Sequence, residues 1–263
     1  KWREATADGI VCGDGKKHPI SFTVRDSQSD TNRAAQVAAD LIGNDSVDIM
    51  LVAASPDTVN PVADQCEALS VPCLSTDALM EPYFFGRGGD PSRGFKWTYH
   101  TFWGMGQTST ASFDMWGQLE TNKVVGVLWP NDVDGNAYRE YYTPLIEKQG
   151  YKMVDGGEFQ EPCEDFTFAI SAFKKAGCDI ISGVFIPPDL ANFWSQAKQQ
   201  GLNPKVFEAS KASVFPGAIE ALGEIGDGLC GPHWWHPTYP YKSSLTGQTC
   251  QELADEFTKD TGG

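Results

Sequence analysis

Strand-sized apolar segments alternate with amphipathic helical segments along most of this chain, and this alternation limits its fold more than any other feature. It is clearest in residues 22–76, where a strand at Phe22–Arg25 precedes a helix, a strand at Val47–Ala53, a second helix and a strand at 72–74. Consecutive strand–helix units of this kind build parallel sheets that are covered by helices. The predicted fold class is therefore α/β.

The same alternation continues toward the end of the chain. Further strands are predicted at 96–102, 123–129, 151–154, 179–185, 205–208 and 228–230. Helices are predicted, from apolar residues three or four apart, at 108–121, 136–149, 165–176, 189–200, 215–222 and 251–259. Two loop-rich stretches interrupt this pattern, at residues 80–106 and 231–247. We interpret them as passages between two lobes and predict that residues 1–104 together with 240–263 form one lobe, and residues 105–239 the other.

Charge and cysteine content narrow the functional classes. The chain of 263 residues has a formal net charge of −15, which would repel nucleic acid. Seven cysteines suit an oxidising compartment, and no cysteine or histidine cluster has the spacing of a metal site, so we predict no metal and no cofactor. Cys66 and Cys73 could close a short loop as a disulfide, or could be two buried thiols; the sequence leaves both alternatives open.

Motifs of common enzymes are missing from the sequence. No strand–GxGxxG–helix fingerprint, no GxxxxGK[ST] phosphate loop and no GxSxG nucleophile elbow occurs. The four histidines are not spaced for a catalytic triad. We therefore predict that the protein is not an enzyme and name no catalytic residue.

Polar residues follow two predicted neighbouring strands. Ser55 and Thr58 come after the strand at Val47–Ala53, and Ser75, Thr76 and Asp77 follow the strand at 72–74. Because the carboxyl ends of parallel strands meet at one edge of a sheet, the hydroxyl and N–H donors there could bind a carboxylate-sized group. Each hydroxyl could equally cap a helix without any ligand.

An aromatic residue and a lysine extend the candidate site. Trp103 lies at the first passage between lobes and could supply an apolar wall, although core packing is the commoner fate of an aromatic side chain. Lys211 follows the predicted strand at 205–208, on the same kind of edge in the second lobe. It could pair with a ligand carboxylate as a point charge, or be a solvated loop lysine.

The order of several stretches resembles the type I periplasmic solute-binding proteins of ABC importers, specifically the branched-chain amino acid (Leu/Ile/Val) group. The stretches are VRDSQSD with its following helix, ASPDTVNPVADQCEALSVPCLST, VVGVLWPNDVDGNAY, DFTFAISAFKKAGCDIISGVFIPPDLANFWSQAKQQGL and FPGAIEALGEIGDGL. The resemblance implies two Rossmann-like lobes with parallel sheets joined by crossover strands. It also implies that the first lobe is truncated at both ends, since members of the family have a strand before the first helix and continue past the last one.

The resemblance implies a ligand site as well. In the family, corners that match Ala54–Ser55 and Ser75–Thr76–Asp77 meet the ligand carboxylate. The second lobe contributes an aromatic residue where this chain has Asp134, the strand end that matches Phe185, and an acid near Lys211. We expect a small carboxylate-bearing metabolite, either amino acid-like or an aliphatic or aromatic acid. A lysine in place of that acid reverses the favoured ligand charge, which favours a ligand without an α-amine, or a dicarboxylate.

The resemblance implies the partners and the location. We expect a small-molecule ligand, an ABC permease in the membrane and a monomeric protein in the periplasm or outside the cell; a lipid anchor on the full-length protein is left open. The alternative is a ligand-sensing domain of the same fold in a receptor or signalling protein.

Overall fold

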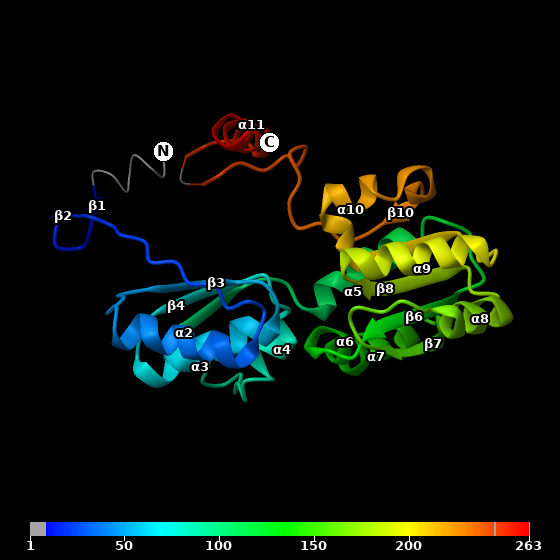
Figure 1. Cartoon of the computed structure of the whole chain (residues 1–263), viewed down its shortest axis with the longest axis horizontal. Coiled ribbons are helices and arrows are strands. Elements are labelled where there is room, and N and C mark those ends of the chain that lie inside the picture. The colour runs from blue at the N-terminus through cyan, green and yellow to red at the C-terminus, as the bar shows by residue number, and fades with distance from the viewer. Residues whose placement is uncertain (1–8, 245, 263) are drawn as a thin grey trace. The chain divides into compact units, whose positions relative to one another are not determined.

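The computed structural model describes residues 9–244 and 246–262, and the chain divides into two compact units, Lys1–Trp103 and Gly104–Gly263 (Figure 1). This division puts residues 240–263 in the second unit, whereas the sequence suggested that they join the first lobe. The lobe assignment stays a prediction.

The first unit is built around a parallel sheet in the order β3-β4-β5. Its strands are β3 (Met50–Ala53), β4 (Cys73–Thr76) and β5 (Thr98–Thr101), and its helices are α2 (Thr31–Gly43), α3 (Pro56–Leu69) and α4 (Met80–Phe84). A small core forms where buried residues of α2 and α3, such as Ala34, Ala38 and Val59, meet the sheet. The pairing of Ala53 with Thr76, and of Thr76 with Thr101, aligns the carboxyl ends of all three strands. A hairpin of β1 (Ile10–Val11) and β2 (Lys17–His18) precedes this sheet.

The predicted strand at Phe22–Arg25 is wrong. These residues form no strand, and Phe22 and Val24 are 69% and 83% exposed. A cavity of about 230 Å³ is lined both by residues 25–27 and by β3. A strand is stabilised by its ladder partner, and none of the described strands pairs with this segment. Its apolar character alone is therefore not enough to make it a strand.

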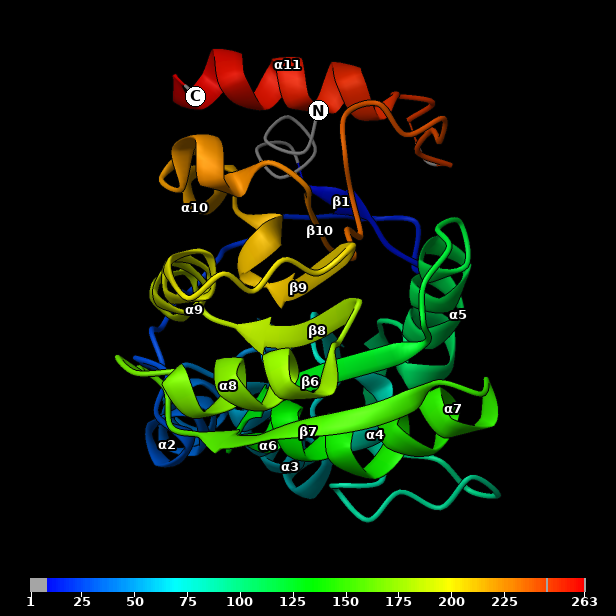
Figure 2. The ribbon, with the colours of Figure 1, turned by 90° about the vertical axis from the view of Figure 1, so that its right-hand side faces the viewer.

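The second unit contains a five-stranded parallel sheet in the order β10-β9-β8-β6-β7 (Figure 2). Its strands are β6 (Val124–Pro130), β7 (Lys152–Phe159), β8 (Ile180–Phe185), β9 (Val206–Lys211) and β10 (Leu229–Cys230). Its helices are α5 (Met105–Trp116), α6 (Val133–Ala137), the π-helix η1 (Tyr138–Tyr142), α7 (Thr143–Lys148), α8 (Thr167–Ala176), α9 (Pro187–Gln199), the 3₁₀ turns η2 (Ala212–Val214) and η3 (Gly223–Gly226), α10 (Pro216–Glu220) and α11 (Cys250–Thr261). The parallel α/β fold class predicted from the sequence is confirmed in both units.

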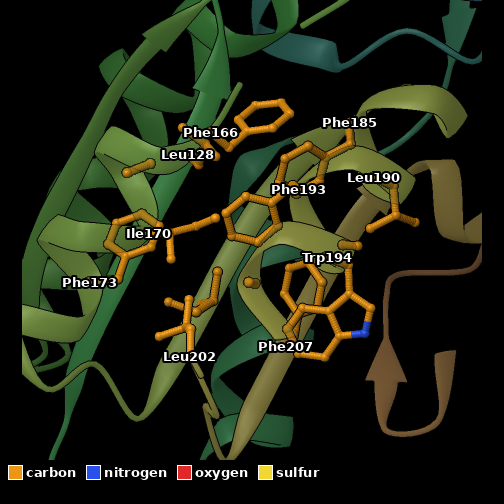
Figure 3. Packing of buried hydrophobic residues seen from close by; sticks show 14 of the residues in the cluster. Leu128, Phe166, Ile170, Phe173, Phe185, Leu190, Phe193, Trp194, Leu202 and Phe207 are labelled. Atoms are coloured by element: carbon orange, nitrogen blue, oxygen red, sulfur yellow. The ribbon is translucent and has the colours of Figure 1, made fainter. Parts of the chain in front are cut away.

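Neighbouring residues of β9 show how this sheet is covered on both faces. The Phe207 side chain packs on Trp194 of α9, with ring centroids 4.4 Å apart, whereas the next side chain, Glu208, reaches Ser112 and Trp116 of α5. Successive side chains of a strand point to opposite faces, so α9 and α5 cover opposite sides of the sheet. The α9 side holds an aromatic core that includes Phe166, Phe185 and Phe193 (Figure 3).

The predicted helix at 136–149 is confirmed as a helical run in which α6, η1 and α7 follow one another without a gap. The backbone stays right-handed helical at both junctions, so η1 is a π-helical turn inside this run. Pro144, which has no N–H to donate, directly follows this turn.

Candidate functional site

The carboxyl ends of β3 and β4 form a corner with an unusual backbone. Ala54, Ser55 and Asp77 have positive φ angles of 71°, 58° and 61°, a conformation that non-glycine residues seldom adopt. The Ser55 N–H donates to the Asp77 carbonyl at 3.0 Å and ties the two strand ends together. We call residues 54–55 and 75–77 the strand-end corner.

Ser55 precedes α3 but does not cap it with its hydroxyl. The structure gives the Ser55 side chain no capping hydrogen bond, and α3 begins with Pro56, which needs no acceptor for its nitrogen. The hydroxyl of Thr58 instead donates to the carbonyl of Ala54. The helix-cap alternative therefore does not describe the Ser55 side chain, which is partly exposed beside the corner.

Ser75 and Thr76 already have partners on β5. Ser75 is 2% exposed, and its Oγ lies 2.8 Å from Nδ1 of His100 and 3.1 Å from the carbonyl of Tyr99. Nε2 of His100 lies 2.7 Å from the carbonyl of Ala78, which assigns the N–H to Nε2 and leaves Nδ1 as an acceptor. Thr76 donates to the carbonyl of Thr101 at 2.8 Å. Ser75 thus supports the corner from inside, whereas Thr76 is exposed and Ser55 is partly exposed.

Charge at the corner comes from Asp77. Burial raises the pKa of its carboxyl above the ordinary value. An ionised Asp77 would repel a carboxylate nearby, whereas the protonated form would not.

Trp103 ends the first unit. Its ring stacks on Phe102 with centroids 4.2 Å apart, and its carbonyl accepts the Met80 N–H at 3.1 Å. The residue is partly exposed and is held near the start of α4.

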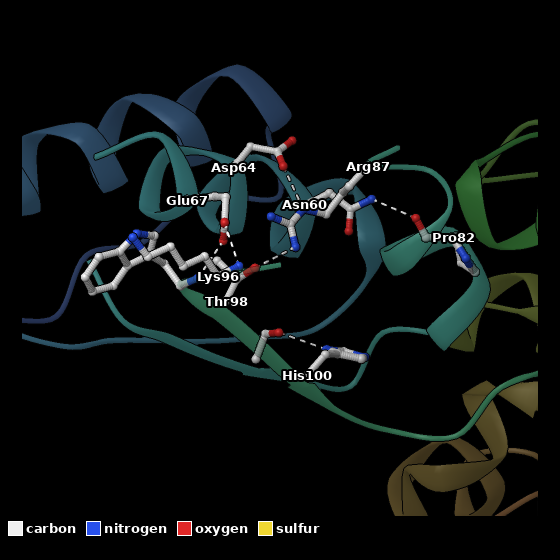
Figure 4. A network of polar contacts seen from close by, with 10 residues as sticks. Asn60, Asp64, Glu67, Pro82, Arg87, Lys96, Thr98 and His100 are labelled. Atoms are coloured by element: carbon white, nitrogen blue, oxygen red, sulfur yellow. Dashed lines mark hydrogen bonds and ion pairs between the residues drawn. The ribbon is translucent and has the colours of Figure 1, made fainter. Parts of the chain in front are cut away.

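A buried arginine fixes β5 against α3 behind the corner (Figure 4). The Arg87 side chain is 1% exposed, and it donates to Asp64 at 2.6 Å and to Thr98 at 3.2 Å. Glu67 of α3 accepts the N–H groups of Lys96 and Trp97, just before β5. These bonds hold the strand that carries His100.

In the second unit, Lys211 lies at the carboxyl end of β9 and is paired with two carboxylates. Its Nζ is 3.2 Å from Asp132 and 3.1 Å from Asp134. Asp132 also accepts the Gly135 N–H at 2.7 Å and so caps α6. Burial alone would lower the pKa of the Lys211 ammonium, but the charges of Asp134, Asp132 and Glu161 raise it above its ordinary value.

Lys211 is therefore not a solvated loop lysine, and its pairing with a ligand carboxylate stays a prediction. Its ammonium faces the two aspartates at contact distance, and the charge of Glu161 lies close enough to act on it. Burial raises the pKa of the Glu161 carboxyl above its ordinary value. A ligand carboxylate would meet an ammonium that is already neutralised.

Phe185 belongs to the core of the second unit. Its side chain is 0% exposed and stacks on Phe193 with ring centroids 5.2 Å apart (Figure 3). Its neighbour in the sheet is Lys211, so the Phe185 backbone lies at the strand end next to the lysine. Only the backbone of this predicted site residue is left for a contact at the edge.

Sequence reasoning missed three residues of these edges. His100 is found only when β5 is paired with β4, which places it opposite Ser75. Asp132 stands three residues before Gly135 directly after a strand, a capping pattern that could have been recognised. Glu161 carries no local signal, because its proximity to Lys211 arises from the order of strands in the sheet.

Two further findings concern residues 9–244 and 246–262. None of their helices has the length and apolar character needed to cross a bilayer. Within the same ranges no three His, Cys, Asp or Glu side chains gather as a metal site requires.

Comparisons with known proteins agree with this fold. A family model described as periplasmic binding protein matches residues 3–263. No curated protein sequence gives a significant match. The fold is similar to that of the leucine-binding protein LivK from Thermotoga maritima, with a TM-score of 0.77 and 18% identity, over 94% of this chain and 66% of that one.

Two other similar structures contain a bound ligand. The branched-chain amino acid transporter substrate-binding protein LivJ from Streptococcus pneumoniae, with isoleucine, gives a TM-score of 0.79 at 15% identity over 100% of this chain and 69% of that one. A solute-binding protein of an ABC transporter from Rhodopseudomonas palustris, in complex with 3,4-dihydroxybenzoic acid, gives a TM-score of 0.75 at 18% identity over 99% of this chain and 67% of that one. The chain thus spans about two thirds of the length of these structures. Periplasmic binding proteins bind solutes without catalysis, as the sequence predicted for this chain, and the match over nearly its whole length shows that the chain belongs to the periplasmic binding protein family.

Proposed function

We propose that the protein captures a small carboxylate-bearing solute outside the cytoplasm and presents it to an ABC permease. The observation that carries this proposal is the strand-end corner, where the left-handed backbone of Ala54, Ser55 and Asp77 and the Ser55 hydroxyl face the carboxyl edge of the sheet. Hydroxyl and backbone N–H donors at such an edge suit a carboxylate.

The ligands of similar proteins support a carboxylate. Isoleucine, 3,4-dihydroxybenzoic acid and the 4-hydroxybenzoate bound to another protein from R. palustris all carry one. Their remaining parts differ, from an amine with an aliphatic chain to a phenol. The carboxylate is what these ligands share, and the corner is our candidate for its recognition.

The strand ends of the second unit offer a second set of polar groups for a solute. Lys211 is already paired, so the groups offered there are the oxygens of Asp132 and Asp134 together with the aromatic residues near the strand ends. Carboxylate oxygens accept hydrogen bonds from a hydroxyl or an amine. We therefore propose a bifunctional solute, an acid that also carries a hydroxyl or amine donor, with Lys211 acting as the counter-ion that holds both aspartates.

A thermal-shift screen over amino acids, hydroxy acids, and aliphatic and aromatic acids tests this proposal. A ligand at 100 times its Kd stabilises the folded state by about 2.7 kcal/mol. An acid with a second donor should raise the Tm, while the corresponding amide and the acid without the donor should raise it less. A screen in which amides stabilise the protein as well as acids do would contradict carboxylate recognition.

The alternative function is ligand sensing within a receptor or signalling protein of the same fold. The two functions share the binding site and differ in the partner. Binding of the liganded protein to a permease in proteoliposomes, with stimulation of its ATPase, would support transport. A liganded protein that leaves the permease unaffected would favour sensing.

A further inference from the structure

Two cysteines of the first unit lie where the chain turns back on itself. Cys66 is in the last turn of α3, Cys73 begins β4, and both side chains are 0% exposed. Ser70 ends the helix in a left-handed conformation, and the Cys66 carbonyl accepts the N–H of both Ser70 and Val71, the latter at 3.0 Å. The chain between the cysteines is therefore a tight, well-bonded return from helix to strand.

The two thiols face each other across this return. In the structure both are free thiols of the same buried cluster between α3 and the sheet, and a hydrogen bond between them acts on their pKa values. The bond from Cys66 lowers the pKa of the Cys73 thiol, burial opposes this, and the positive charge of Arg87 lowers it further.

We propose that Cys66 and Cys73 form a structural disulfide in the native protein. The family places the protein outside the cytoplasm, where disulfides form and persist. Because both side chains are buried in the folded unit, the exchange takes place before the unit packs: the thiolate of one cysteine attacks a protein disulfide oxidant, and the other thiol then displaces the oxidant from the mixed disulfide. Two protons leave the cysteines, two electrons pass to the oxidant, which becomes a dithiol, and one S–S bond forms in the protein.

Cys178 provides the contrast within the same chain. It is also buried, at 5% exposure, but burial followed by the charge of Asp179 raises the pKa of its thiol to about 11. No second thiol contributes to its environment. A buried cysteine of this chain therefore does not necessarily have a second thiol beside it, as Cys66 and Cys73 do.

The bond would have a defined structural effect. It closes the return between α3, which follows Ser55, and β4, which leads to Ser75, Thr76 and Asp77. Both halves of the strand-end corner would then be anchored at the opposite end of the sheet. The disulfide does not depend on the proposed function, because it concerns the fold of the first unit.

Peptide mapping of the protein secreted into an oxidising compartment tests the proposal. Protein purified without reductant is alkylated in denaturant and cut after glutamate, since Glu67 lies between the two cysteines. The expected result is a pair of peptides joined through Cys66 and Cys73, while Cys178 is alkylated. Recovery of Cys66 and Cys73 as alkylated thiols would overturn the proposal.

Thermal unfolding with and without dithiothreitol gives a second readout. For a ring of this size, reduction should lower the Tm by roughly 5–10 °C in the wild type and in Cys178→Ala. Cys66→Ala should be insensitive to the reductant. Equal sensitivity of Cys66→Ala and the wild type would overturn the assignment, and the mapping result holds even if this variant does not fold.

Discussion

The two units carry polar residues at the same place, the carboxyl ends of parallel strands, but they arrange them in opposite ways. In the first unit the strand-end corner relies on left-handed backbone, a hydroxyl and one carboxyl group. In the second unit the strand ends hold an ammonium between two carboxylates. The stability of an edge formed by backbone should depend little on any one side chain. The stability of an edge formed by paired charges should depend on every member of the pair.

The largest effect is expected from breaking the charge cluster. Lys211→Met leaves Asp132 and Asp134 uncompensated in a largely buried setting, which should lower the free energy of unfolding by about 2–4 kcal/mol. Lys205→Met is the matched control at the other end of β9, because the Lys205 side chain is 52% exposed in its pair with Asp179. It should cost less than about 1 kcal/mol in urea denaturation. Equal decreases in the free energy of unfolding would show that the Lys211 cluster stabilises the fold no more than the exposed Lys205–Asp179 pair does.

A buried acid of the second unit gives a pH-dependent effect. Burial raises the pKa of Glu208, while bonds from Ser112 and Trp116 at 2.5 and 3.0 Å lower it. A raised folded-state pKa means stability that is present below the unfolded value, near 4.3, and is lost as pH rises through the folded value. Ser112→Ala raises this pKa further, so its cost should reach about 1–3 kcal/mol at neutral pH and shrink in acid.

Ser109→Ala controls for the loss of a buried hydroxyl on the same helix. Ser109 donates to the carbonyl of Gly106 and does not touch an acid. Its cost, measured by denaturation between pH 4 and pH 8, should not vary with pH. If the cost of Ser112→Ala is equally flat, Glu208 is not the titrating group.

A smaller effect, on ligand affinity and not on stability, is expected at the strand-end corner. Ser55→Ala should weaken binding of the acid found in the screen by about tenfold, the effect of one hydrogen bond to a charged group, with little change in stability. Ser46→Ala is the control, because Ser46 also has a positive φ, of 53°, but precedes β3 instead of following it. Calorimetry should show unchanged affinity for Ser46→Ala; an equal loss would remove Ser55 from the site.

The smallest effect is expected at Asp77. Because burial raises its pKa, wild-type affinity for an acid should increase as pH falls through the Asp77 titration. Asp77→Asn removes the negative charge, so it should bind the acid about threefold to tenfold more tightly at neutral pH and lose that pH dependence. Weaker binding by Asp77→Asn would indicate that the carboxylate itself contacts a donor on the ligand.

Much of the fold could be predicted because its signals are local. The predicted strands at 123–129 and 179–185 correspond to β6 and β8, whose side chains are almost all buried. The helix at 189–200 corresponds to α9, one or two residues earlier, because Pro187 is tolerated in a first helical turn. The strand at Phe22–Arg25 failed because a strand also needs a neighbour, and apolar composition does not reveal one.

The site could be predicted by position but not by partner. The predicted positions at strand ends agree with the structure, since Ser55 and Asp77 follow strands and Lys211 is the last residue of β9. Their pairings come from residues distant in sequence, such as Asp132, 79 positions before Lys211, and His100, 25 positions after Ser75. Such contacts depend on strand order, which periodicity does not encode.

The left-handed residues of the strand-end corner have a consequence for the thermodynamics of recognition. Each such residue costs about 1–3 kcal/mol, and the chain meets that cost once, when it folds. A solute that arrives later finds Ala54, Ser55 and Asp77 already held, with the Ser55–Asp77 hydrogen bond in place. Little ordering entropy then opposes binding, so the conformational strain of the folded protein becomes selectivity for solutes that fit a fixed shape.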